Sequence, residues 1–306
     1  MLSINFGVET ENKCINHYEE IKDWLINRLD SKKIKKVLKD QLIDDIENII
    51  KGTPKQLLKL NKKYMLEFPK KLNRKGKLIN DNRITYIFNY QEFRRKFGFN
   101  LSNNLKIECC PYCNKNYTST LFIKRLNNKN VFPEFDHFYP QSNFPFLSLS
   151  FYNLIPSCNV CNTHFKSNKD SSKIFHPYTK VKTKHFNFKS FPNDVASLYG
   201  SGKNISLDFD FNSNNSINNK IKKSIDFFGI KEIYETCHTD LIQKIIHKKI
   251  AFSDRYIKEL ENTYNLSFDD AYNILFETHH KEILLHKKPF SKLKKDIFDD
   301  VNIKSS

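Results

Sequence analysis

The sequence predicts an α+β protein, with mainly helical N- and C-terminal regions around a central region of short strands. Three observations support this prediction. Apolar residues recur at helical spacing towards both ends of the chain. The stretch 106–180 is instead rich in aromatic residues, Pro, Asn and Ser, and it contains two Cys-x-x-Cys pairs. No uninterrupted apolar run of about 18 residues is present, so we expect no membrane-spanning helix and no membrane partner.

The N-terminal region, residues 1–105, is predicted to be helical and basic. Residues 13–52 carry apolar side chains at helical spacing, and Gly52 followed by Pro54 is a stop signal. A second helix is predicted at 83–98, and its apolar face is expected to pack in a core. This face carries Ile84, Ile87, Tyr90, Phe93 and Phe97.

The central region, residues 106–180, is predicted to contain a hairpin and a short helix. Segments 117–124 and 131–137 have strand composition. Asn127, Asn128 and Asn130 separate them, which is typical of a turn. The short helix is expected after Cys158.

The C-terminal region, residues 181–306, is predicted to begin with strands and to continue as helices. Strand composition appears at 185–189 and again at 205–211. From about 215 to 300 the apolar residues return to helical spacing. We therefore expect a helical bundle there, which either folds on its own or docks a protein partner.

The chain carries a strong excess of positive charge, with 51 Lys and Arg against 34 Asp and Glu. Residues 51–77 hold ten of these basic residues and a single acid, Glu67. Such an excess predicts a polyanionic partner, nucleic acid first, and we expect segment 51–77 to contact its backbone. Solubility and codon usage are an alternative cause of the lysine content, but they do not explain the clustering.

Four of the seven cysteines form two pairs with the spacing of zinc ligands. The first pair is Cys110 and Cys113, and the second is Cys158 and Cys161. In a reducing compartment such pairs indicate metal ligands before disulfides, and four thiolates suit a closed tetrahedral Zn²⁺ site. Cys109 competes as a ligand, but only Cys110 keeps the two-residue spacing. The sequence therefore predicts one structural zinc ion.

Residues that carry chemistry lie between and directly after these pairs. Asp136 precedes His137 at the end of a predicted strand, Asn153 follows, and Asn162 comes directly after the last cysteine. This order resembles the zinc-knuckle branch of the HNH (ββα-metal) nuclease family, over roughly residues 107–170. The wider context resembles HNH effectors of bacterial anti-phage systems, most closely the nuclease subunit of Septu and retron-linked Septu systems.

The resemblance implies a role for each of these residues in phosphodiester hydrolysis. His137 would be the general base, because a neutral imidazole accepts a proton near neutral pH. Asp136 and Asn162 would hold a catalytic Mg²⁺ or Mn²⁺ through oxygen. Asn153 would orient the loop that carries His137 by hydrogen bonds. Adjacent strand residues point to opposite faces, so Asp136 and His137 share a site only if the strand end twists or bulges.

Three further residues belong to this segment or follow it. Lys166 would contact a phosphate group of the substrate. The family more often has His at the position of Asn162, and His164 is an alternative ligand two residues further on. Whether His176 also joins the metal site stays open.

The chain is not expected to use nucleotide itself. Gly200 to Lys203 reads Gly-Ser-Gly-Lys, which looks like part of a phosphate-binding loop. The complete motif needs Gly at 197 and Ser or Thr at 204, where this chain has Ser197 and Asn204. A separate ATPase subunit, which the resemblance implies as a partner, would have to supply any ATP hydrolysis.

The favoured hypothesis is a cytoplasmic, metal-dependent HNH endonuclease that acts in anti-phage defence. The first residues lack the pattern of a secretory signal, which agrees with the cytoplasm. One alternative is a zinc-stabilised nucleic-acid-binding or scaffold module without cleavage. Another is a nuclease specific for RNA, such as tRNA. The motif concerns phosphate chemistry and not the sugar, so DNA and RNA both remain open.

Overall fold

The computed structural model describes residues 1–31, 34–124, 129–180, 185–212 and 215–301. Its contacts divide the chain into two compact units. The N-terminal unit consists of Asn5–Lys106 and Thr118–Ser172, and the C-terminal unit of Met1–Ile4, Ile107–Tyr117 and Lys173–Ser306. The division into 1–105, 106–180 and 181–306 stays a prediction. Among the described helices, none combines the length and the apolar character needed to cross a bilayer.

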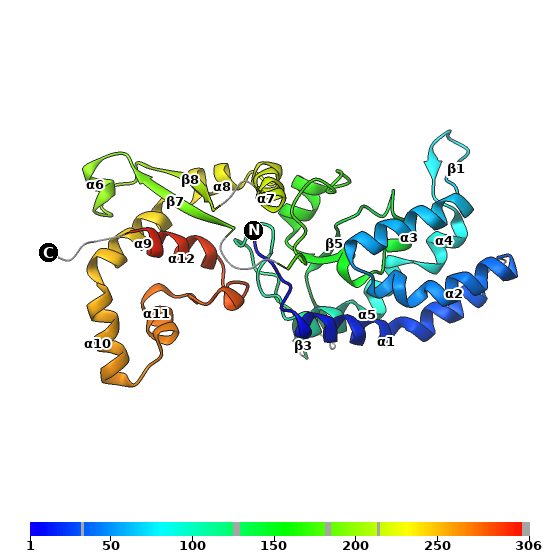
Figure 1. The fold of residues 1–306 in the computed structure, drawn as a ribbon, viewed down its shortest axis with the longest axis horizontal. Helices are drawn as coiled ribbons and strands as arrows, with labels where there is room; N and C mark the ends of the chain where they lie inside the picture. The colour runs from blue at the N-terminus through cyan, green and yellow to red at the C-terminus, as the bar shows by residue number, and fades with distance from the viewer. Residues whose placement is uncertain (32–33, 125–128, 181–184, 213–214, 302–306) are drawn as a thin grey trace. The chain divides into compact units, whose positions relative to one another are not determined.

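The secondary structure is mixed, in agreement with the predicted α+β class. Within the described residues the strands form four two-stranded antiparallel sheets, and helices account for most of the remaining structure (Figure 1). The α-helices of the N-terminal unit are α1 (Val8–Asp30), α2 (Lys36–Lys51), α3 (Pro54–Glu67), α4 (Asn82–Ile87) and α5 (Tyr90–Leu105). Its strands are β1 (Lys71–Leu72), β2 (Leu78–Ile79), β3 (Leu121–Ile123), β4 (Lys129–Val131), β5 (Glu134–His137) and β6 (Leu154–Ser157). Its shorter helices are η1 (Pro145–Leu147), η2 (Phe151–Asn153) and η3 (Val160–Lys166).

The helix predicted at 13–52 is found as two helices, α1 and α2, which pack against each other (Figure 1). Residues 32–33 between them lie outside the described part of the chain. The core stripe of α1 is Ile21, Leu25 and Leu29, whose side chains are fully buried. Helix α2 ends directly before Gly52, as the stop signal predicted. Helix α3 then begins with Pro54 in its first turn and a capping box from the Thr53 and Gln56 side chains.

The helix predicted at 83–98 is also divided, into α4 and α5. Asn89 begins the second helix, because its side-chain oxygen accepts a hydrogen bond from the Glu92 backbone N–H at 3.0 Å. Because of this interruption α5 is a separate helix, and it packs against α1. An ion pair of 2.6 Å between Arg28 of α1 and Glu92 of α5 joins the two helices.

The central strands pair differently from the prediction. Segment 121–123 pairs with 129–131, whereas 134–137 pairs with β6, which no strand prediction covered. Pro133 accounts for the change, because it lacks a backbone N–H and interrupts the strand expected over 131–137. Asn127 and Asn128 of the predicted turn lie outside the described residues.

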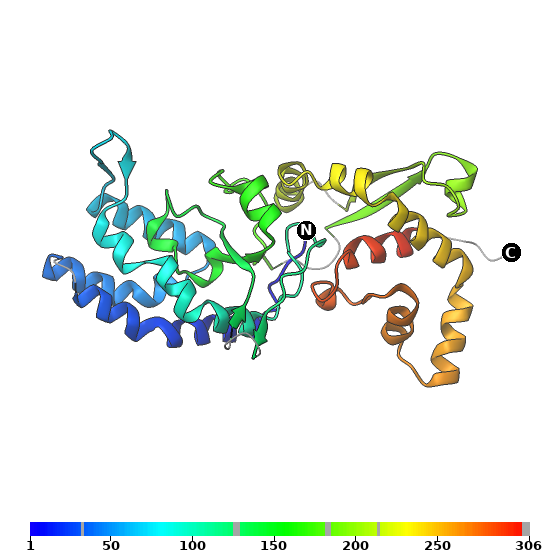
Figure 2. The same ribbon diagram turned by 180° about the vertical axis from the view of Figure 1, so that it is seen from behind.

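The C-terminal unit contains the two strands and the helices that the sequence predicted, and the two strands pair as an antiparallel hairpin. Its strands are β7 (Phe186–Pro192) and β8 (Ile205–Phe211). Its helices are α6 (Val195–Leu198), α7 (Ser216–Phe227), α8 (Ile230–Cys237), α9 (Thr239–Ala251), α10 (Asp254–Tyr264), α11 (Phe268–Phe276), η4 (Glu282–Leu284) and α12 (Ser291–Asp300). Figure 2 shows α10 and α11 side by side, and they share an apolar core with Phe298 of α12.

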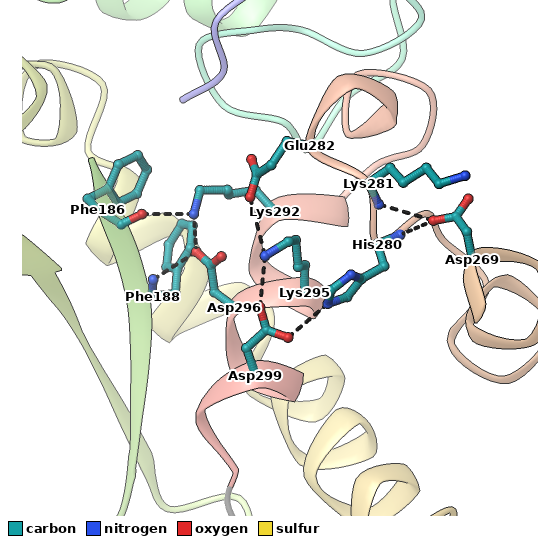
Figure 3. A network of polar contacts seen from close by, with 10 residues as sticks. All are labelled: Phe186, Phe188, Asp269, His280, Lys281, Glu282, Lys292, Lys295, Asp296 and Asp299. Atoms are coloured by element: carbon teal, nitrogen blue, oxygen red, sulfur yellow. Dashed lines mark hydrogen bonds and ion pairs between the residues drawn. The ribbon is translucent and has the colours of Figure 1, made fainter. Parts of the chain in front are cut away.

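A buried polar network fastens α12 to β7 within this unit (Figure 3). The Asp296 carboxylate accepts hydrogen bonds from the Phe188 backbone N–H at 2.9 Å and from the Lys292 ammonium at 2.5 Å. Lys292 also donates to the Phe186 carbonyl at 2.8 Å. One helical turn further on, Lys295 and His280 both contact the Asp299 carboxylate. These contacts stabilise the helix against the hairpin and belong to the architecture of the unit.

Candidate functional site

The four paired cysteines lie together, as the sequence predicted. The sulfur atoms of Cys110, Cys113, Cys158 and Cys161 are all within 4.8 Å of one another, and all four residues are buried. Zinc–thiolate bonds of about 2.3 Å in a tetrahedron separate the sulfurs by about 3.8 Å, so small adjustments would complete a Zn²⁺ site. The cluster is therefore positioned to bind a metal ion.

The first pair has a turn suited to a thiolate. The Asn114 backbone N–H donates to the Cys110 carbonyl at 2.7 Å, and the Lys115 N–H donates to the Cys113 sulfur at 3.4 Å. Cys109 is not a member of this described cluster. Burial raises the pKa of the Cys109 thiol to about 12, so it stays protonated. The prediction that Cys110 and not Cys109 belongs with the other three cysteines is confirmed.

Three of the four residues predicted to be catalytic line a cavity of about 390 Å³ in the N-terminal unit, and the fourth, Asn153, does not. Strand β5 pairs with β6, with Asp136 opposite Ile155 and His137 opposite Leu154. The short helix η3, which carries Asn162, follows β6 directly. Asp136, His137 and Asn162 all line this cavity. Asp136 and His137 are neighbours on a strand, yet both reach the same cavity. His137 is the last residue of β5, and the chain leaves the sheet there.

His137 is oriented by the loop between the two strands. Its Nε2 lies 2.9 Å from the Ser148 carbonyl, and its ring meets the Tyr90 ring edge-on at 4.4 Å between centroids. A carbonyl only accepts hydrogen bonds, so Nε2 carries the proton and Nδ1 has a lone pair. Burial, with a smaller contribution from the positive charge of Lys166, lowers the pKa of His137 to about 4. The imidazole is thus neutral at pH 7.

Asn153 ties together the two ends of that loop. Its side-chain oxygen accepts from the Tyr139 backbone N–H at 2.7 Å. Its amide group donates to the Tyr139 carbonyl at 3.2 Å and to the Leu147 carbonyl at 2.8 Å. The side chain is fully buried, so these hydrogen bonds do not compete with water. These hydrogen bonds fix the loop, and the role of Asn153 in orienting His137 stays a prediction.

Lys166 is buried beside the Asp-His pair. Its ammonium is 2.9 Å from an Asp136 carboxylate oxygen and donates to the His137 carbonyl at 2.5 Å. The exposed fractions of Lys166 and Asp136 are 1% and 2%. A buried carboxylate needs a positive partner, and Lys166 supplies one. The contact with phosphate predicted for Lys166 stays a prediction, and its observed neighbours are the two residues of the Asp-His pair.

Replacing Lys166 by methionine should therefore destabilise the protein. Methionine keeps most of the aliphatic volume but leaves the Asp136 charge buried without its ammonium, which costs about 3–5 kcal/mol. We expect a clear fall in the melting temperature, measured by differential scanning fluorimetry. The double variant Asp136→Asn/Lys166→Met removes both charges and should recover most of the loss. Equal melting temperatures for Lys166→Met and wild type would contradict this description of the pair.

Glu134 lines the cavity and had no predicted role. Its carboxylate accepts hydrogen bonds from the Asn162 amide at 2.7 Å and from the Asn159 amide at 3.2 Å. It makes no ion pair with a described residue. Side chains two apart on a strand share a face, so the period of two from Asp136 was a signal for Glu134. Glu134, Asp136 and Asn162 together offer the oxygen donors that Mg²⁺ or Mn²⁺ prefers.

Arg94 of α5 is a second cavity residue without a predicted role. Its guanidinium lies over the Phe132 ring, 4.9 Å from the centroid, and forms no ion pair within the described chain. No pattern in the sequence links Arg94 to His137, because the two residues come together only when α5 packs beside β5. His164, the alternative ligand, is exposed and does not line this cavity.

Comparison with protein families, curated proteins and solved structures finds no match. The cysteine cluster is suited to a structural metal ion. The cavity combines a neutral imidazole, oxygen donors and an arginine without a carboxylate partner among the described residues. Such a set can bind a phosphate group and accept a proton from water.

Proposed function

We propose that this chain is a metal-dependent endonuclease of the HNH type, which hydrolyses phosphodiester bonds of nucleic acid. The observation that carries the proposal is the order strand, strand, helix in β5, β6 and η3. This order brings Asp136, His137 and Asn162 to one cavity. It is also the arrangement implied by the resemblance to ββα-metal nucleases.

His137 would act as the general base. The hydrogen bond to the Ser148 carbonyl keeps the proton on Nε2, so Nδ1 accepts a proton from the attacking water. Its lowered pKa keeps the acceptor form populated at neutral pH.

The cavity also offers groups for the charge on the phosphate. Glu134, Asp136 and Asn162 would hold Mg²⁺ or Mn²⁺, which would stabilise the developing charge and the leaving oxygen. Arg94 would bind a non-bridging phosphate oxygen through its planar guanidinium. Lys166 balances the Asp136 charge from the protein side. Asp136 thus has two candidate partners, the lysine and the cation.

The cysteine cluster would stabilise this cavity, because two of its cysteines lie close in the sequence to the cavity residue Asn162. Cys158 directly follows β6, and Asn162 directly follows Cys161. A Zn²⁺ ion on these thiolates would hold the junction between β6 and η3. We therefore assign the zinc a structural role, separate from the catalytic cation. The role in anti-phage defence and the ATPase partner are supported by the sequence resemblance alone.

The proposal is tested by a cleavage assay with the purified full-length chain. Supercoiled plasmid and total tRNA are incubated at low salt with added Mn²⁺, with added Mg²⁺, or without divalent cation. The sample without divalent cation is prepared by leaving the cation out and not by adding a chelator, because a chelator would also remove zinc. Nicked or linear plasmid, or tRNA fragments, should appear only with the added cation. Binding of nucleic acid without cleavage under all of these conditions would identify a binding module instead.

A further inference from the structure

A short basic hairpin in the N-terminal unit has a fixed shape although its strands are only two residues long. Strands β1 and β2 pair antiparallel, with Leu72 opposite Leu78. In the turn, the Asn73 side chain accepts hydrogen bonds from the backbone N–H groups of Lys75 at 3.0 Å and Lys77 at 2.9 Å. Gly76 takes the left-handed conformation that the turn needs, with φ of 69°.

The tip of this hairpin presents positive charge without a counter-charge. Arg74, Lys75 and Lys77 are exposed, and their side chains form no ion pair or hydrogen bond with the described residues. The segment from Lys70 to Asn80 contains no acidic residue. The neighbouring acid, Asp81, already binds Arg83 and Lys71 and is not available to the tip.

The base of the hairpin is attached to the loop that borders the candidate site. The Asn80 amide donates to the Gln141 carbonyl at 3.2 Å, and the Lys70 ammonium donates to the Asn143 side chain at 2.9 Å. Gln141 lines the same cavity as His137. A polyanion that bound the hairpin would therefore be held beside the cavity.

The surface between the charges is apolar. The exposed fractions of Leu72 and Leu78 are 68% and 59%, which is unusual for paired leucines. A two-stranded ribbon fits the major groove of B-form DNA, which is about 12 Å wide. Side chains do not reach into the deep, narrow major groove of duplex RNA. Cations at the tip suit the phosphates of DNA, and leucines along the strands suit apolar contact with the thymine methyl groups in the major groove.

We propose that the β1–β2 hairpin is a DNA-binding arm, which docks in a groove of duplex DNA and holds the backbone beside the cavity. The proposal rests on the proposed function for its substrate class. Within the basic segment 51–77, it assigns the affinity for DNA to the side chains of Arg74, Lys75 and Lys77. The contact is with phosphates and is therefore independent of base sequence.

The test compares two triple variants with equal loss of charge. The arm variant is Arg74→Gln/Lys75→Gln/Lys77→Gln, which leaves Asn73 and Gly76 of the turn intact. The control variant, Lys220→Gln/Lys223→Gln/Lys258→Gln, changes exposed lysines of the C-terminal unit. Both are made in full-length His137→Ala protein, so that cleavage does not disturb the measurement. Fluorescence anisotropy gives the affinity for a 30-base-pair DNA duplex and for an RNA duplex of equal length, over a series of salt concentrations.

The arm variant should bind the DNA duplex at least about tenfold more weakly than the control at low salt. Its plot of log affinity against log salt should be less steep by about 2 to 3, because each lost phosphate contact removes about 0.9. Equal affinities and slopes for the two variants would overturn the proposal, as would no binding of DNA or a loss confined to RNA. If the arm variant binds DNA more weakly but the wild-type chain cleaves no substrate, the proposal of a DNA-binding arm holds and the proposed nuclease function is wrong. Equal DNA binding by the two variants, together with His137-dependent cleavage by the wild-type chain, would mean that the arm is wrong and the nuclease valid.

Discussion

Replacing His137 by alanine should reduce the rate of nucleic acid cleavage at least about 100-fold, because a positioned general base contributes a factor of this order or more. Alanine removes the Nδ1 lone pair that would accept the proton of water. It also removes the hydrogen bond to the Ser148 carbonyl, at the edge of a loop that Asn153 holds independently. We therefore expect the fold to survive. The measurement is the initial rate on plasmid or tRNA with Mn²⁺ at saturating protein.

The matched control is His247→Ala, which changes an exposed histidine of the C-terminal unit. This variant should cleave at the wild-type rate. The His137→Ala protein should still bind nucleic acid and melt within a few degrees of wild type, which separates lost chemistry from lost structure. Equal cleavage by wild type and His137→Ala would mean that the products come from another site or another enzyme, and the proposed function would then fall.

Replacing Cys158 by serine should remove the structural metal and lower the melting temperature by about 10 °C or more. Structural zinc sites contribute about 10 kcal/mol or more of binding free energy, much of which is available to stabilise the fold. The four sulfurs are buried within 4.8 Å of one another, so loss of one thiolate leaves an incomplete site without water to replace it. Metal content is measured by mass spectrometry, with one zinc per wild-type chain expected.

Cys237 offers a control for this prediction, since it is exposed and is not a member of the cluster. The Cys237→Ser protein should keep its zinc and its melting temperature. Retention of a full zinc equivalent by Cys158→Ser would show that the metal is held by other groups. Cleavage by wild type should need added Mn²⁺ or Mg²⁺ even when the zinc is present, because the thiolate site has no open position.

Local patterns predicted much of the fold and part of the site. Each Cys-x-x-Cys turn depends on neighbours within a few residues, so spacing alone was sufficient to select Cys110 over Cys109. The same holds for the helix end at Gly52 and for the presence of strands near 185–189 and at 205–211, although their pairing was not predicted. The place of Asn153 in the loop after His137 was also predictable, since its hydrogen bonds join residues of one loop.

Strand pairing was predicted less well, because it depends on contacts between distant segments. The composition of 131–137 indicated one strand, but Pro133 divides it, and the second part pairs with residues 154–157. Nothing local indicates which of several apolar segments will supply the partner. The pairing matters for function, because it sets Asp136 and His137 against η3.

The sequence by itself determined the chemical inventory of this protein: four thiols at zinc spacing, an Asp-His pair, two asparagines and a basic segment. Only the tertiary structure decided which groups meet. It buried Lys166 against Asp136, brought Glu134 to Asn162, and brought Arg94 and the β1–β2 hairpin to the borders of one cavity. The physical reason is that burial and ion pairing depend on packing between segments far apart in the chain, which residue spacing does not encode.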